Sequence, residues 1–130
     1  MSSKHIALIS LVVKDYDEAI AFYTQKLGFL LTEDTRLTEE KRWVTVSPPN
    51  SECQLLLAKS ASDTQKNAVG NQTGGRVFLF LHTSDFWEDY QKLLDQGITF
   101  IRPPKEEPYG TVAVFQDLYG NLWDLVQSTH

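Results

Sequence analysis

The apolar and polar positions of this chain follow one pattern twice. Residues 8–23 can be laid on residues 78–93 at an offset of 70, and the physical roles agree although few residues are identical. In each copy an apolar stretch suited to a strand changes to an apolar stripe with helical spacing. The helical stripes consist of Tyr16, Ile20, Tyr23 and Leu27 in the first copy and of Phe86, Tyr90 and Leu93 in the second. The pattern therefore predicts an internal duplication.

The ends of both helices carry matching signals. An acidic residue at the expected N-cap, Asp15 or Asp85, is followed three positions later by a glutamate. This is the capping-box pattern, which satisfies amide donors that a helix leaves unbonded at its start. A glycine suited to the left-handed position after a helix follows each stripe, at Gly28 and Gly97. Both copies therefore predict a strand, a capped helix and a glycine stop.

Further strands complete each copy. An apolar segment follows each stop glycine, and turn-type sequences join the last two strands of each copy. These last strands are expected near 42–47 and 53–58 in the first copy, and near 111–116 and 122–127 in the second. The sequence thus predicts one α+β domain (1–130) with a first β-α-β-β-β module (6–58), a flexible linker or loop (59–75) and a second module (76–128).

Composition narrows the class of protein. The chain has 130 residues, 42% apolar and 22% charged, which suits a single globular domain. Its net charge of −5, with scattered Lys and Arg, argues against a nucleic-acid or anionic-membrane partner. The single cysteine, Cys53, excludes an internal disulfide and fits a reducing compartment. No apolar run nears the ~20 residues of a membrane span, and no signal-peptide pattern is present, so the expected location is the cytoplasm.

Short motifs accompany this duplicated architecture. They are Val13-Lys-Asp15, Ala21-Phe-Tyr23, Leu27-Gly-Phe29, Asp117-Leu-Tyr-Gly-Asn121 and Leu122-Trp-Asp-Leu-Val126. Together with the doubled module they resemble the vicinal oxygen chelate superfamily, which includes glyoxalase I, extradiol dioxygenases, fosfomycin-resistance enzymes and bleomycin-binding proteins. The resemblance implies tandem βαβββ modules forming curved mixed sheets, the glyoxalase/bleomycin resistance-like fold, whose paired cups enclose a ligand cavity. Because this fold hosts many unrelated chemistries, function must be argued from the site.

The resemblance also assigns metal-ligand positions. Metal-dependent members place a ligand, often His, in the first strand of a module and a carboxylate in the last strand. The matching positions of this chain hold Leu8, Phe78 and Asp124, and the repeat partner of Asp124 is Gln54. Leu and Phe have no donor atom, and one carboxylate with one amide does not make a three- or four-ligand site. We therefore expect no metal and no other cofactor; a metal bound in a displaced way is the alternative.

Strand side chains point alternately to the two faces of a sheet, so some are expected to lie beneath the helices and the others to line the cup. The segment 105–110 could form a lid, with Tyr109 supplying a hydroxyl, or an ordinary surface turn. The mainly apolar, aromatic-lined surface with few polar groups is typical of a small-molecule pocket; the alternative is a cavity filled by these side chains. Including Tyr109, the candidate ligand-binding residues are Leu8, Ser10, Gln54, Leu56, Phe78, Phe80, His82, Tyr109, Leu122 and Asp124.

Asp124 is the candidate catalytic residue. A carboxylate among apolar side chains is poorly solvated, so its pKa is expected to rise unless a partner compensates. It could act as a general base or pair with a cationic ligand. The alternative is a structural aspartate bonded to strand amides or to an arginine. His82 could titrate near neutral pH, although its strand-to-helix position is more typical of a structural or exposed residue. His130, at the chain end, is expected to be disordered.

Three functions follow from these observations. The first is a metal-free module that binds or sequesters a small apolar or aromatic molecule. The second is a lyase, isomerase or dioxygenase-type enzyme that uses Asp124 as base or a displaced metal. The third is an interaction module whose cups are filled. The missing metal ligands favour the first over the metal-dependent form of the second, and the aromatic residues at cup positions leave the third open. Exposed sheet edges, and analogy with the resembled family, predict a homodimer; the sequence leaves open whether modules pair within one chain or across two.

Overall fold

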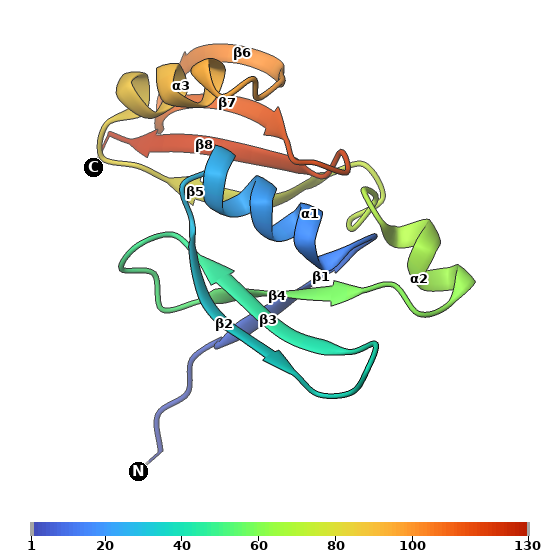
Figure 1. Ribbon diagram of the computed structural model, residues 1–130. Helices are drawn as coiled ribbons and strands as arrows, with labels where there is room; N and C mark the ends of the chain where they lie inside the picture. Colours follow the sequence, from blue (N-terminus) through green and yellow to red (C-terminus); the bar gives the residue numbers. More distant parts are fainter. Residues whose placement is uncertain (1, 130) are drawn as a thin grey trace. The chain divides into compact units, whose positions relative to one another are not determined.

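The computed structural model describes residues 2–129, so His130 lies outside the described residues. The chain divides into two units, Met1–Val69 and Gly70–His130. Each unit contains one four-stranded sheet with its own helix on one face (Figure 1). The predicted α+β fold with two similar mixed sheets is therefore confirmed. None of the helices within residues 2–129 has the length and apolar content needed to cross a membrane.

The first unit orders its strands β1-β4-β3-β2. β1 runs parallel to β4, whereas β3 pairs antiparallel with both β4 and β2. The outer strands of this sheet are thus β1 and β2. The elements are β1 (Leu8–Val13), α1 (Tyr16–Ala21), η1 (Phe22–Lys26), β2 (Leu30–Arg36), β3 (Arg42–Ser47), β4 (Gln54–Lys59) and α2 (Asp63–Ala68).

The helix of the first unit begins as predicted and ends with a wider turn. The Asp15 carboxylate accepts a hydrogen bond of 2.9 Å from the Glu18 amide. The last turn, η1, is a π-helix, which the apolar spacing did not predict. Within it the Thr24 hydroxyl donates to the Ile20 carbonyl at 2.7 Å and competes with backbone amides for that oxygen. Gly28 then stops the helix at φ +75°, as its position predicted.

The helix-facing side of the first sheet is mostly aliphatic. α1 contacts β3 and β4 and lies across the sheet in Figure 1. Alternate residues of β1, β3 and β4 are buried beneath it, as the two-residue period requires. The buried side chains are Leu11, Val13, Val44, Val46, Leu55 and Leu57 from the strands, with Tyr16, Ala19, Phe22 and Tyr23 from the helix.

The segment expected to be a flexible linker contains a helix. α2 buries none of its residues, so packing does not explain it. Instead, the Ser62 side chain accepts from the Gln65 amide at 3.2 Å, and the Gln65 side chain accepts from the Ala61 amide at 2.7 Å. This is a reciprocal cap of the Ser-x-x-Gln type, a signal that the sequence carries. The expectation of an unstructured linker was therefore wrong for Asp63–Ala68.

The second unit repeats the order of the first, β5-β8-β7-β6, with β5 parallel to β8. The Asp85 carboxylate caps α3 by accepting from the Glu88 amide, and Gly97 follows the helix at φ +80°. Both signals were read correctly from the sequence. The elements are β5 (Val77–His82), α3 (Phe86–Asp95), β6 (Phe100–Glu107), β7 (Gly110–Gln116) and β8 (Leu122–Ser128).

Aromatic rings fill the helix side of the second sheet. Consecutive ring centroids lie 4.6–5.9 Å apart, within the range of favourable aromatic pairs. The series runs through Phe86, Tyr90, Phe100, Phe115 and Trp123. The second unit therefore has an aromatic core, where the core of the first is mainly aliphatic.

The two sheets differ in register at their parallel strands. In the first sheet Leu8 pairs with Gln54. The repeat offset would place Phe78 opposite Asp124, but Asp124 pairs with Phe80, and the register shifts between Val77 and Leu79. A bulge adds a residue to one strand and displaces every pairing beyond it. The duplication therefore does not carry residue-level pairing from one module to the other.

Candidate functional site

Each sheet has a face opposite its own helix, which we call the distal face. In the first unit Leu11, Val13, Leu55 and Leu57 lie on the helix side, so their neighbours in the strands lie on the distal face. The pairing of Leu8 with Gln54 and of Ser10 with Leu56 places these side chains together. The four first-module candidates, Leu8, Ser10, Gln54 and Leu56, thus share the distal face of the first sheet.

Gln54 belongs to a hydrogen-bonded group on this face. The Thr32 hydroxyl lies 2.5 Å from the Gln54 Oε1 atom and 2.6 Å from the Thr45 hydroxyl. It also lies 3.0 Å from the Thr45 carbonyl oxygen. The Thr32 hydroxyl therefore holds the Gln54 side chain by its amide oxygen, and Thr45 in turn holds the Thr32 hydroxyl. This arrangement favours a fixed polar patch on the first sheet.

A row of paired residues crosses the distal face of the second sheet. Because directly paired residues place their side chains on the same face, consecutive pairings across three ladders define one line. From β6 to β5, the line consists of Arg102, Val114, Asp124 and Phe80. We call it the Asp124 row. It brings a guanidinium, a carboxylate and an aromatic ring onto one surface within a single unit.

Asp124 has no compensating hydrogen bond. Its Oδ1 atom is enclosed and has no hydrogen-bond partner among residues 2–129. Burial raises the pKa of the Asp124 carboxyl, and the positive charges of Arg102 and His82 lower it in part. The expectation of a poorly solvated carboxylate is met, and the structural alternative, a carboxylate bonded to amides or an arginine, does not describe this side chain.

The side chains on the distal face of the second sheet differ widely in solvent exposure. Phe80 is 63% exposed, so most of its ring is open to solvent. His82 is also exposed. Val114 and Val126 are only 4% and 6% exposed. The accessible side chains of this face therefore lie on its two outer strands, β5 and β6, on either side of the half-buried Asp124 and the buried Val114.

The remaining candidates take different positions. Leu122 pairs with Val77 and is half-buried. Phe78 lies at the register shift, is half-buried and has no partner in the ladder. Tyr109 is exposed at the tip of the β6–β7 hairpin, where Glu107 pairs with Gly110. The segment expected to form a lid or a surface turn is thus a paired hairpin, because its residues continue the two strands.

The donor set does not fit the metal centre that the family resemblance implies. Of the four matching positions, Leu8 and Phe78 lack donor atoms, and Gln54 has its oxygen bonded to Thr32. Asp124 is the one carboxylate among them. Within residues 2–129 no group of three or more His, Cys, Asp or Glu side chains is arranged to hold a metal ion. A borderline metal needs three or four such donors.

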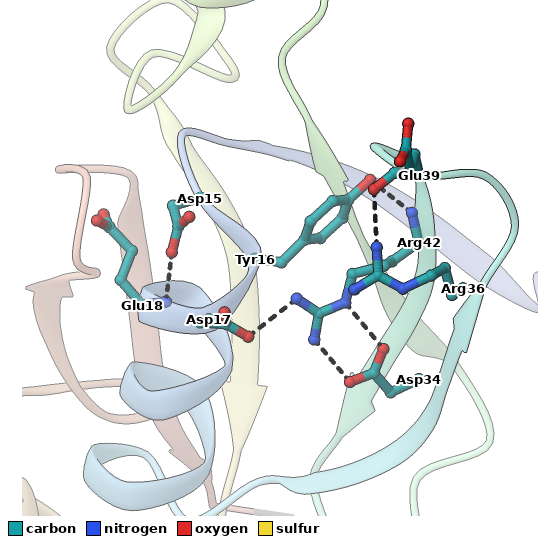
Figure 2. Close-up of polar contacts among 8 residues, drawn as sticks. All are labelled: Asp15, Tyr16, Asp17, Glu18, Asp34, Arg36, Glu39 and Arg42. Carbon is teal, nitrogen blue, oxygen red and sulfur yellow. Dashed lines mark hydrogen bonds and ion pairs between the residues drawn. The ribbon is translucent and has the colours of Figure 1, made fainter.

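The best-formed ionic cluster of the first unit is structural. Figure 2 shows the Arg42 guanidinium bonded at both ends of the Asp34 carboxylate, at 3.1 and 2.7 Å, and to Asp17 at 2.9 Å. Arg42 also lies over the Tyr16 ring, 5.1 Å from its centroid, while the Tyr16 hydroxyl accepts from the Arg42 amide. These contacts raise the pKa of Arg42 and lower that of Asp34. Since every charge is paired, the cluster joins α1 to β2 and β3 and leaves no group for a ligand.

Sequence reasoning missed residues on the β2–β3 and β6–β7 hairpins. Thr32, which bonds Gln54, Thr45, which bonds Thr32, and Arg102, which shares a row with Asp124, stood outside the candidate set. Bulges in β2 and β6 change the alternation at Thr32 and around Arg102. The Pro103-Pro104 pair after Arg102 was the available signal, since proline within a strand marks an edge or a bulge.

Comparison with known proteins agrees with this architecture. Residues 3–125 match the family described as "Glyoxalase/Bleomycin resistance protein/Dioxygenase superfamily". An uncharacterized protein of Shewanella frigidimarina (strain NCIMB 400) is 61% identical over 124 residues, 94% of this chain and 92% of that protein.

Two solved structures are similar over nearly the whole chain. UcmS2 is 31% identical with a TM-score of 0.84, covering 96% of this chain and 98% of its own. TnmS3, described as an antibiotic binding protein from Streptomyces sp. CB03234, is 30% identical with a TM-score of 0.81, covering 99% of each chain. The chain therefore belongs to the glyoxalase/bleomycin resistance protein/dioxygenase superfamily.

Proposed function

We propose that this protein binds a small, flat, largely apolar molecule without a metal, and that the distal face of the second sheet holds it. One observation carries the proposal: Asp124 offers an enclosed, unbonded carboxylate oxygen directly beside the exposed ring of Phe80. A buried acceptor without a donor costs free energy, so a side chain of this kind needs a reason to persist. A ligand that donates a hydrogen bond to the other oxygen of this carboxylate would stabilise its charged form and so supply that reason.

The chemistry of the surface supports an aromatic ligand. An exposed phenylalanine ring can stack on a flat molecule, and stacking is stronger where the ligand also covers neighbouring apolar side chains. Asp124 would then fix the orientation, as a few placed polar groups do in most small-molecule sites. TnmS3, which is similar over the whole chain, is described as an antibiotic binding protein. That description supports sequestration of a small molecule as the form that binding takes.

A second candidate function rests on the pKa of Asp124. A carboxyl whose pKa is raised by burial is a better general base once it is ionised, because its proton affinity is closer to that of the proton it removes. This supports a metal-free lyase or isomerase in which Asp124 removes a proton from the bound molecule. Turnover of the bound compound, lost in Asp124→Asn, would distinguish catalysis from binding alone.

We also propose that the protein is a homodimer. Each sheet ends in outer strands, β1 and β2 or β5 and β6, and apolar side chains such as Leu8, Leu30 and Ile101 are exposed on them. An unpaired sheet edge with exposed apolar side chains is a surface on which a second chain can pack. Light scattering at micromolar concentration is expected to give twice the mass of the chain; the mass of one chain would contradict the proposal.

Titration with 2-naphthol, a flat aromatic donor, tests the binding function. Saturable chemical-shift changes in heteronuclear NMR spectra are expected, largest at the amides of Phe80 and Asp124. Phe80→Ala is expected to weaken binding roughly tenfold, the equivalent of one stacked ring. Trp87→Ala is the matched control, because Trp87 is an exposed aromatic of the same unit on α3. No saturable binding, or equal effects of the two substitutions, would contradict the proposal and favour a filled surface.

A further inference from the structure

Arg102 and Asp124 form an unusual charged pair. They lie on the same face, separated in the Asp124 row by Val114. Neighbouring strands are about 4.8 Å apart, so their backbones are roughly 10 Å apart. The charge of Arg102 acts on the Asp124 carboxyl, yet the two make no ion pair within 4 Å among the described residues. The two opposite charges therefore share one face of the sheet without forming an ion pair.

Neither side chain is satisfied by the protein. The Asp124 Oδ1 atom is enclosed and unbonded, so any donor must approach the remaining part of the carboxylate. Arg102 is exposed on β6, and its five guanidinium donors suit two oxygens held in a plane. By contrast, Arg42 in the first unit has a carboxylate at each end of its guanidinium. The second sheet thus offers an acceptor and a planar donor in one line with an aromatic ring.

We propose that the ligand is a hydroxyaromatic acid or its carbonyl equivalent: a flat ring system that stacks at Phe80, donates a hydroxyl hydrogen to Asp124 and presents an adjacent carboxylate or carbonyl oxygen to Arg102. This deepens the proposed binding function and depends on it. The substrate class follows from the polarity of the two partners. A purely cationic ligand would meet the like charge of Arg102, and a ligand without a donor would leave the Asp124 carboxylate unpaired.

Neighbouring charges do not change this assignment. Lys105 and His82 lie at the two ends of the next row on the same face, which adds positive charge beside Arg102. Lys105 is bonded to Glu107 at 3.2 Å, so its charge is partly neutralised. Among these groups Arg102 is the cation that stands in line with Asp124. We therefore assign it as the specificity-determining residue for the acceptor end of the ligand.

The test compares 3-hydroxy-2-naphthoate with 2-naphthol, which has the hydroxyl but no carboxylate, on the wild-type protein and on Arg102→Gln. Arg102→Gln is expected to weaken the naphthoate about 10- to 100-fold, the loss of a charged hydrogen-bonded pair, and to change 2-naphthol less than twofold. Arg76→Gln, which removes an equal charge from the same unit, is expected to leave both affinities unchanged. A lowered affinity in both glutamine variants would mean that net charge, and not Arg102, attracts the ligand.

The outcomes distinguish the proposed ligand class from the proposed binding function on which it depends. If 2-naphthol binds in a Phe80-dependent way but Arg102→Gln binds the naphthoate as wild type does, the ligand class is wrong and the binding function stands. If neither compound binds the wild-type protein, both are wrong. A naphthoate affinity that falls in Arg102→Gln alone supports the assignment.

Discussion

The two units place different polar side chains on the distal faces of their sheets. Gln54 in the first sheet has its amide oxygen bonded by Thr32, whereas Asp124, which the sequence offset of 70 matches to it, has an enclosed oxygen without a donor. The first side chain is neutral and fixed; the second is ionisable and has a raised pKa. Duplication has therefore kept the fold in both copies while leaving an unsatisfied group in one. An unsatisfied buried group is where function is expected, since stability alone would remove it.

The two faces of the second sheet also differ, and a substitution on the helix side is expected to have the largest effect on stability. Phe115 is completely buried and contacts the rings of Phe100 and Trp123. Phe115→Ala is expected to lower the free energy of unfolding by about 3–5 kcal/mol, through lost burial and a cavity. Urea denaturation followed by circular dichroism measures it.

Phe80→Ala is the matched control for that substitution. It changes the same residue type on the same sheet, but at a side chain that is 63% exposed. The change in unfolding free energy is expected to stay within about 0.5–1 kcal/mol. Equal losses for the two substitutions would mean that the distal face is a packed core and not a binding surface.

The ionic cluster of the first unit gives the next largest effect. Arg42→Met keeps the apolar stem and removes the bonds to Asp34 and Asp17, so unfolding free energy is expected to fall by about 1–2 kcal/mol at neutral pH. The lowered pKa of Asp34 sets the pH dependence. A carboxyl with a lowered pKa in the folded state stabilises above its unfolded pKa of about 3.9 and loses this effect as pH falls through the folded value.

The difference in unfolding free energy between wild type and Arg42→Met is therefore expected to become smaller as the pH falls into the acid range. Denaturant titrations across the acid range measure it, with Arg36→Met as control, because Arg36 bonds only a backbone carbonyl, that of Glu39. A difference that persists unchanged at the lowest pH would show that packing on Tyr16, and not charge, accounts for the cluster.

Local signals predicted the elements well, and non-local pairing limited the site. The N-caps at Asp15 and Asp85 and the stops at Gly28 and Gly97 depend on a few neighbouring residues, and all four were predicted correctly. The register of β5 against β8 depends on how two distant strands align, and the bulge beside Phe78 changes it further. No local pattern specifies this alignment, and Phe80 rather than Phe78 lies opposite Asp124.

The candidate site was predicted in part for the same reason. Asp124 was found because alternation along β8 is regular, and its poor solvation follows from its apolar neighbours. Arg102 was missed because two register shifts in β6 separate it from a simple alternation. The Arg42 cluster was missed because it joins a helix to two strands. Side chains that meet through tertiary structure leave little trace in one sequence.

Substitution of Gln54 is expected to have a small effect. Gln54→Ala removes the hydrogen bond from Thr32, whose hydroxyl still has the Thr45 oxygens as alternatives. A loss of about 0.5–1.5 kcal/mol of unfolding free energy is therefore expected, at the lower end if Thr32 turns to Thr45. Thermal or urea unfolding measures the loss. An increase in stability would remove the contrast between a satisfied Gln54 and an unsatisfied Asp124.

Asp124→Asn has the smallest expected effect on stability and tests the account most directly. The pKa of Asp124 is raised in the folded state, so ionisation costs stability as pH rises from the unfolded to the folded pKa. The asparagine variant avoids this cost and leaves no bonded partner behind, because the carboxylate oxygen has none. Thermal melts at acid and neutral pH, with and without 2-naphthol, are the measurement. The account predicts equal melting temperatures in acid, an equal or higher one for Asp124→Asn at neutral pH, and loss of the shift caused by 2-naphthol. A large drop in melting temperature with an unchanged shift would contradict it.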